Sequence, residues 1–157
     1  MRSTLGHLSP LSRRAVADGV VAGAPAWALS GLPSTAWTLA GGGNPLVAVR
    51  AAGTLILSPD ASPTALLAAG AGAHTIISFG WSTLLAFALP PSATVVVGAA
   101  AGLAIAALDL GLIAGRYPAI RALPTLPQVA DHLAFGTLVG TVVAHRRSSV
   151  RRPPARS

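Results

Sequence analysis

The sequence predicts an all-α integral membrane protein, a bundle of four transmembrane helices with a short interfacial or re-entrant helix between spans 1 and 2. Three observations lead to this fold class. Hydrophobic residues make up 52% of the 157-residue chain and charged residues only 10%, whereas a soluble domain is about one-quarter charged. Four apolar runs are long enough to cross a hydrocarbon core of about 30 Å. The basic residues lie mostly at the two ends of the chain, outside these runs.

The first span is predicted at residues 15–33, after a polar N-terminal segment, residues 1–14, that we expect to be cytoplasmic. Pro25 should kink this helix, because proline lacks a backbone donor and clashes with the preceding turn. Asp18 lies near the expected start, where a carboxylate interacts favourably with the helix dipole. Asp18 also interrupts the apolar core that a cleaved signal peptide requires, so we expect the span to be retained.

A shorter helix is predicted at residues 45–58. Asn44 and Pro45 are a typical helix start, an N-cap residue followed by proline at the first helical position. A helix of about 13 residues is only about 20 Å long, which is too short for a hydrocarbon core of about 30 Å. We therefore expect this helix to lie at the membrane interface or to enter the bilayer partway.

Three further spans, at residues 63–89, 93–115 and 128–144, complete a single transmembrane domain over residues 15–144. Pro90 and Pro91 leave only a tight connection between the first two of these spans, which predicts a helical hairpin. Residues 145–157 are rich in arginine and proline, and we expect them to form a disordered, basic cytoplasmic tail.

The arginines predict the orientation, because short arginine-rich segments stay in the cytoplasm. With four spans, both termini are cytoplasmic in a bacterial inner membrane. A fifth crossing at residues 45–58 would place the basic termini on opposite sides, so we prefer four. Anionic lipids are expected at the arginine-rich tail. Nucleic acid is not an expected partner, since the net charge of +7 flanks apolar segments.

Glycine pairs four residues apart recur in three of the four spans, and small residues at this spacing let another backbone approach closely. They predict tight helix packing and would also suit a homo-oligomer or a membrane-protein partner. Helical spacing places Asp109 and His132 on these glycine faces, whereas Asp131 lies about 100° around the helix from His132 and should face a different helix. The pairs are Gly19 and Gly23, Gly98 and Gly102, Gly111 and Gly115, and Gly136 and Gly140.

Ionisable residues inside the spans predict the candidate site, because such groups are costly in a bilayer and mark function by default. In the four-span topology Asp109, Asp131, His132 and His74 fall in the outer half of the membrane. Arg116 follows Asp109 by seven positions, so it is expected to neutralise that carboxylate from the same helix face. The second span can add hydroxyl groups to this cluster from Thr75, Ser78 and Ser82.

Three functions remain open from the sequence. Our first expectation is an accessory or structural membrane protein, in which the polar groups only fasten helices together. The alternative is a proton-linked or polar-solute carrier that uses the intramembrane Asp and His side chains. A minor alternative is haem held between His74 and His132. The chain lacks common catalytic signatures and has no cysteine, so we expect no enzyme, no metal site and no resident cofactor.

Overall fold

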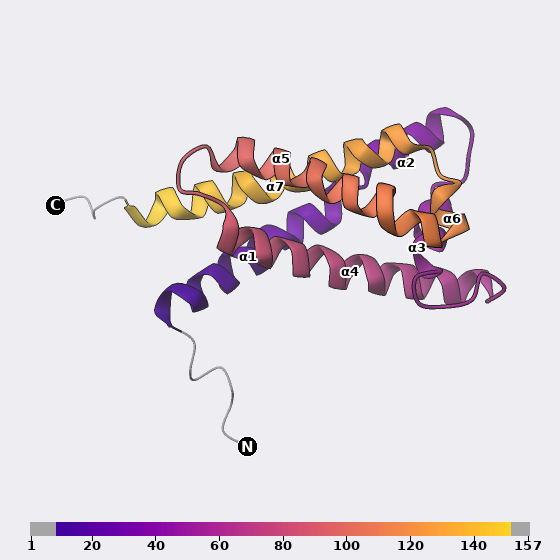
Figure 1. Ribbon diagram of the computed structural model, residues 1–157, viewed down its shortest axis with the longest axis horizontal. Coiled ribbons are helices and arrows are strands. Elements are labelled where there is room, and N and C mark those ends of the chain that lie inside the picture. The colour runs from indigo at the N-terminus through magenta and orange to yellow at the C-terminus, as the bar shows by residue number, and fades with distance from the viewer. Residues whose placement is uncertain (1–8, 152–157) are drawn as a thin grey trace, which may run out of the picture.

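The computed structural model describes residues 9–151, and this part of the chain consists of helices joined by turns, without strands. It forms an elongated bundle (Figure 1), with the long helices running along its longest axis. The long helices are α1 (Pro10–Leu29), α4 (Pro63–Ala88), α5 (Thr94–Leu108) and α7 (Thr125–Arg151). Shorter helices connect them, namely α2 (Leu32–Ala40), α3 (Val47–Gly53) and α6 (Pro118–Arg121). The predicted all-α class is therefore confirmed for the described residues.

Helices α1 and α4 begin in the same way, with a serine N-cap and a proline at the first helical position. The Ser9 hydroxyl accepts from the Ser12 amide at 3.1 Å, and the Ser62 hydroxyl accepts from the Ala65 amide at 3.2 Å. Each cap satisfies one of the first-turn amides that have no partner within the helix. Helix α1 therefore starts at Pro10, five residues earlier than predicted.

The predicted hairpin between residues 63–89 and 93–115 is wrong. Helix α5 packs along α7, and α4 packs along α1 and α3, whereas α4 and α5 do not pack along each other. The reason lies in the glycine faces. A Cβ atom added to Gly98 of α5 would lie 2.5 Å from the carbonyl oxygen of Gly136 of α7, and one added to Gly140 would lie 2.8 Å from the Thr94 carbonyl oxygen. Only glycine permits this approach, so α5 is held by α7.

The glycine pairs differ in how they are used. An added Cβ on Gly19 would lie 2.5 Å from Thr83 Cα, so the α1 pair lies against α4. Gly53 of α3 and Gly70 of α4 also face each other's helix backbone, which the spacing rule did not detect. Gly111 and Gly115 have no atom within 4 Å of an added Cβ. The close helix contacts thus depend on some of the glycines and not on all of them.

Two helical segments are long and apolar enough to cross a membrane, Pro10–Ala40 with 31 residues and Thr94–Arg116 with 23 residues. Helices α4 and α7 have 26 and 27 residues, but within the described residues they are not among these candidate spans. The structure thus provides two candidate spans where the sequence predicted four.

The C-terminal region differs from its prediction. Helix α7 runs to Arg151, although the sequence predicted that the last span ends at Ala144 and that a disordered tail begins at residue 145. Arg146 and Arg147 bond to other helices of the bundle, which explains why the helix continues through them. The rest of the predicted tail, residues 152–157, and the N-terminal residues 1–8 lie outside the described part of the chain.

Candidate functional site

A half-open cavity of about 230 Å³ lies between α4 on one side and α5 and α7 on the other. The junction of α1 with α2, together with α3, contributes the remaining wall. Four of the five predicted site residues line it, namely His74, Asp109, Asp131 and His132. The other lining residues are Ser30, Gly31, Ala52, Leu55, Ala73, Ile77, Ser78, Trp81, Ile105, Gln128 and Phe135.

Asp109 and His132 form a hydrogen-bonded pair across the contact of α5 with α7. His132 Nε2 lies 3.1 Å from Asp109 Oδ2, and both side chains are half-buried. His132 Nδ1 lies 2.8 Å from the carbonyl oxygen of Gln128, one turn earlier in α7. A carbonyl can only accept, so Nδ1 carries a proton and donates it. A further proton must lie between Nε2 and Oδ2, because two lone pairs would otherwise face each other. The pair therefore holds one exchangeable proton.

The helix changes its pitch at Asp109. Helix α5 passes there into a π-helical turn, η2 (Asp109–Ile113), and then into a 3₁₀ turn, η3 (Ala114–Arg116). A single π-helical turn within an α-helix is uncommon and is found frequently at functional sites. Because residues in it bond five positions apart, the seven-residue spacing of an α-helix no longer places two side chains on one face.

Arg116 therefore does not play its predicted role. It is exposed and does not line the cavity. Within residues 9–151, the ion-pair partner of Asp109 is His132 and not Arg116. The predicted contact requires a regular α-helix from residue 109 to residue 116, and η2 and η3 break that regularity.

Asp131 faces a different helix from its neighbour His132, as the helical spacing predicted. Asp131 Oδ1 accepts from the Ser34 amide at 2.9 Å. Ser34 is the third residue of α2, where backbone amides have no partner within the helix and the helix dipole is positive. The sequence analysis did not predict α2, so it did not identify this partner. Asp131 thus fastens the start of α2 to α7 while also lining the cavity.

His74 bonds to the end of α1. Its Nε2 lies 3.0 Å from the carbonyl oxygen of Trp27, and the two rings lie 6.4 Å apart, centroid to centroid. Trp27 belongs to the last turn of α1, whose carbonyl groups have no partner within the helix. Since a carbonyl only accepts, His74 donates from Nε2, and its Nδ1 remains an acceptor in the neutral ring. His74 itself is exposed at the edge of the cavity.

The hydroxyl groups of α4 separate into two kinds. Thr75 and Ser82 donate to carbonyl groups of their own helix. Ser78 is only 4% exposed and lines the cavity, and it has no hydrogen-bond partner among the described residues. Gln128 is a cavity residue that the sequence analysis missed, because an amide near the start of a span carries no distinguishing pattern.

The geometry does not favour haem between His74 and His132. Both ring nitrogens of His132 and Nε2 of His74 are already hydrogen-bonded, so ligation through His132 would break a bond to Gln128 or Asp109. Within the described part of the chain, no three His, Asp or Glu side chains are grouped to hold a metal ion.

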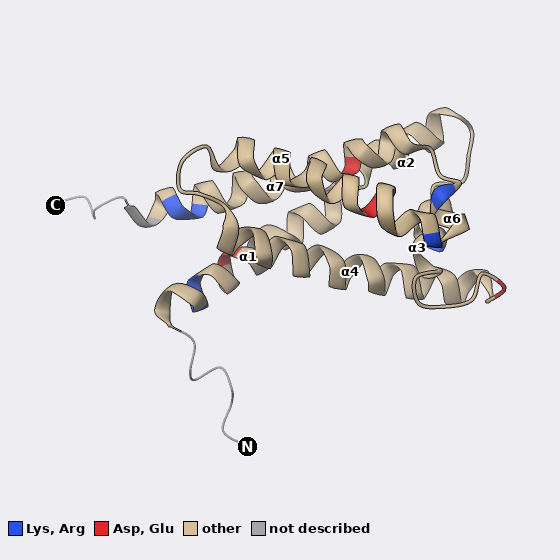
Figure 2. Ribbon diagram, in the orientation of Figure 1, with Lys and Arg blue, Asp and Glu red and all other residues tan. Residues whose placement is uncertain are grey.

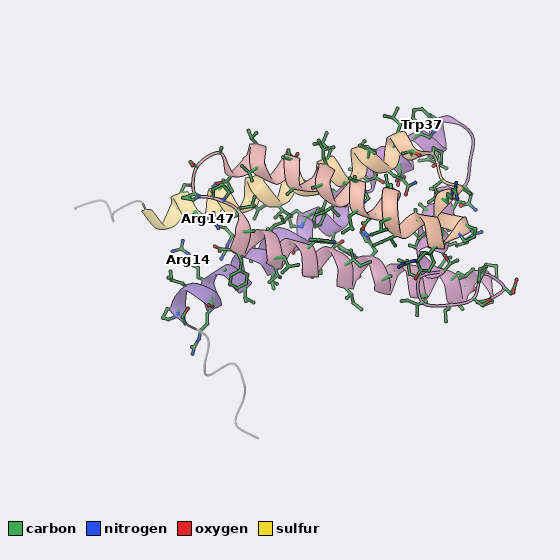
Figure 3. The ribbon with its side chains drawn as sticks, in the orientation of Figure 1. Arg14, Trp37 and Arg147 are labelled. Atoms are coloured by element: carbon green, nitrogen blue, oxygen red, sulfur yellow. The ribbon has the colours of Figure 1, made fainter. Side chains whose placement is uncertain are left out.

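A second polar cluster lies at the other end of the bundle, where Figure 3 labels Arg14 and Arg147. Asp18 is 4% exposed. Its carboxylate forms an ion pair with Arg146 Nε at 2.6 Å and a longer one with Arg14 Nε at 3.9 Å. Arg147 donates to the carbonyl groups of Ala86 and Leu89, each at 2.9 Å. Because α1 begins at Pro10, Asp18 lies beyond the first turn. The dipole role predicted for Asp18 is therefore replaced by an ion pair between α1 and α7.

Comparison with known proteins supplies no relative. No protein-family model matches the chain, and neither a curated protein nor a solved structure matches it. Its function is therefore argued from the cavity and the polar groups around it.

Proposed function

We propose that the chain is a multi-pass membrane protein whose four long helices all cross the bilayer, with both ends of the described region on the cytoplasmic side. Helices α4 and α7, with 26 and 27 residues, exceed the roughly 20 residues that a crossing requires. Large apolar side chains are exposed on the long helices, as on Ile76, Leu84, Val96 and Leu133. Arginines lie toward the two ends of the bundle (Figure 2), whereas acidic residues lie both between them and at the ends.

This topology makes a direct test simple, because the chain contains no cysteine. Single cysteines at Ser12 and Ser149 should react with an impermeant maleimide only after the membrane is permeabilised. A cysteine at Ser58, in the connection between α3 and α4, should react in intact cells or spheroplasts. Equal labelling of Ser12→Cys and Ser58→Cys before permeabilisation would refute the four-span topology.

Within that bundle, we propose that the chain is a small proton-linked carrier of a polar solute. The observation that supports the proposal is that the cavity of about 230 Å³ brings His74, Asp109, Asp131 and His132 together from different helices. The Asp109 and His132 pair holds one proton between two half-buried groups, which suits it to release or accept that proton as a solute binds.

An accessory or structural protein is the second candidate, and a specific observation favours it. His74, Asp109, Asp131 and His132 each already have a hydrogen-bond partner within the protein. Three of those bonds join different helices and so would fasten the bundle without any solute. Under this proposal, the arginines near Asp18 would contact anionic headgroups at the cytoplasmic surface.

Transport by proteoliposomes separates the two candidates. Liposomes with the purified protein and an internal pH dye are incubated in a small-molecule extract of the producing cells, and the washed lumen is analysed by mass spectrometry. A carrier predicts a solute that accumulates with a change of internal pH. Asp109→Asn should abolish both signals in a folded protein.

The matched control is Asp60→Asn, which makes the same chemical change at an exposed turn before α4. It should transport like the wild type. A wild-type protein that accumulates no solute, together with an Asp109→Asn variant whose helices separate more readily in detergent, would reject the carrier and support the accessory function.

A further inference from the structure

We infer that the cavity selects a small protonated amine, that is, an organic cation with N–H donors. This inference rests on the proposed function, because it names the class of solute for the same cavity.

The cavity wall holds a carboxyl group that has no ion-pair partner among the described residues. Its lining includes Asp109 and Asp131 but no arginine, and the chain has no lysine. Asp109 is paired with His132. Asp131 accepts from a backbone amide, which is neutral, and within residues 9–151 it forms no ion pair. A cation in the cavity would supply the missing charge, and a charge-assisted bond to a carboxylate is among the stronger hydrogen bonds in proteins.

The groups that remain free in the wall are mostly acceptors. A carboxylate has about four lone-pair sites, so Asp109 and Asp131 keep acceptor capacity after the bonds described above. In a neutral ring, Nδ1 of His74 is also an acceptor, since Nε2 donates to Trp27. Gln128 donates from its amide nitrogen to carbonyl groups near the start of α7. Its amide oxygen therefore remains available as an acceptor. Such a wall is complementary to an ammonium group, which only donates.

Ser78 is the independent sign that a polar ligand completes the site. It is 4% exposed, it lines the cavity, and its hydroxyl has no partner among the described residues. Its hydroxyl is therefore available to the cavity. A ligand that places a polar atom beside Ser78 would give this hydroxyl a partner.

The rest of the wall limits the size and character of the ligand. The volume of about 230 Å³ is below the roughly 300 Å³ at which sites for drug-sized ligands begin. Trp81, Phe135 and Ile105 belong to the apolar part of the lining. An aromatic face attracts a cation, so a compact amine with a short apolar or aromatic body matches both parts of the wall.

Isothermal titration calorimetry on the full chain in lipid nanodiscs tests the inference with three probes of one shape. Benzylamine is the cation, benzyl alcohol the neutral analogue and benzoate the anion. We expect benzylamine to bind at least about tenfold more tightly than either of the others. Benzyltrimethylammonium, a cation without N–H donors, should bind more weakly than benzylamine. Equal or tighter binding of benzyl alcohol or benzoate, or no binding of benzylamine, would overturn the inference.

Two variants locate the binding. Asp131→Asn should lower benzylamine affinity about tenfold and leave benzyl alcohol unchanged, whereas the control Asp60→Asn should alter neither. Ser78→Ala keeps the charge of the cavity and should lower benzylamine affinity about fivefold. It is the variant to test if Asp131→Asn does not fold. Unchanged benzylamine affinity in Ser78→Ala would also overturn the inference.

The outcomes separate this inference from the proposed function. Selective benzylamine binding without solute flux in proteoliposomes would leave a cation site and reject the carrier. Flux of a neutral or anionic solute would support the carrier and reject the cation site.

Discussion

Replacement of Gly136 by alanine tests the contact that holds α5 against α7. An added Cβ at Gly136 would lie 2.8 Å from the Gly102 amide nitrogen and 2.9 Å from Gly102 Cα, with the Gly98 carbonyl oxygen nearer still. These are all backbone atoms, so the helices must separate by at least 0.6 Å to restore an ordinary contact of 3.4 Å at the Gly102 nitrogen, and by more at the Gly98 oxygen. Overpacking of this kind costs about 1–3 kcal/mol, while alanine gains about 0.5–1 kcal/mol over glycine within a helix.

The matched control is Gly80→Ala in α4, where an added Cβ has no atom within 4 Å. It should show only the helix gain, so the two variants should differ by about 1–3 kcal/mol, or about five- to 150-fold in the unfolding equilibrium constant. Unfolding by sodium dodecyl sulfate in mixed micelles, followed by tryptophan fluorescence, measures this difference. Equal stability of Gly136→Ala and Gly80→Ala would refute the close approach of α5 and α7.

Three further predictions concern the polar groups that join helices. Arg147→Gln should lower the free energy of unfolding by about 2 kcal/mol, because bonds to a charged donor contribute about 1.5–3 kcal/mol. Arg147→Lys should retain only part of this stability, since lysine lacks the planar guanidinium group. Equal stability of the wild type and Arg147→Gln would contradict this prediction. Arg146→Gln should destabilise by about 1–3 kcal/mol, because it leaves the buried Asp18 carboxylate with only a distant partner, and adding Asp18→Asn should restore part of the loss in the same unfolding assay. Asp131→Ala should speed amide hydrogen exchange at Ser34, because the Asp131 carboxylate accepts a hydrogen bond from the Ser34 amide. An unchanged exchange rate at Ser34 would show that Asp131 does not hold α2.

The two ends of α4 follow from local chemistry, and that is why the sequence predicts them closely. Pro63 after Ser62 and the two prolines after Leu89 bound α4 closely, because caps and proline act within one turn of the chain. The first span was placed too late, since Ser9 and Pro10 are as strong a start as Ser62 and Pro63 but are followed by polar residues. A hydropathy boundary is therefore not a helix boundary.

The order of helices in the bundle could not be read in the same way. A short connection at Pro90 and Pro91 suggested that α4 and α5 pair, but helix pairing is decided by which backbones can approach, and Gly98 and Gly136 bring α5 to α7. The ion pair of Asp18 with Arg146 joins residues 128 positions apart. No single-sequence pattern relates such residues, so this pair was found only in the structure.

The candidate site was partly predictable for a physical reason. Ionisable groups in an apolar helix generally face the bundle interior, so Asp109, Asp131 and His132 could be expected beside the cavity without the tertiary structure, whereas His74 is exposed at its edge. The prediction for Arg116 required a regular helix after Asp109, and the π-helical turn η2 removed that condition. Glycine at position 111 and the apolar residues around it give no local signal for this turn.

Native mass spectrometry of the protein released from its own membranes, without prior delipidation, tests the central claim that the cavity is a ligand-binding site within a membrane bundle. The account predicts a small basic molecule bound in one-to-one ratio to the wild-type chain and to Asp60→Asn, and absent from Asp131→Asn. A protein that carries only lipid masses, with the same spectrum for wild type and Asp131→Asn, would contradict it.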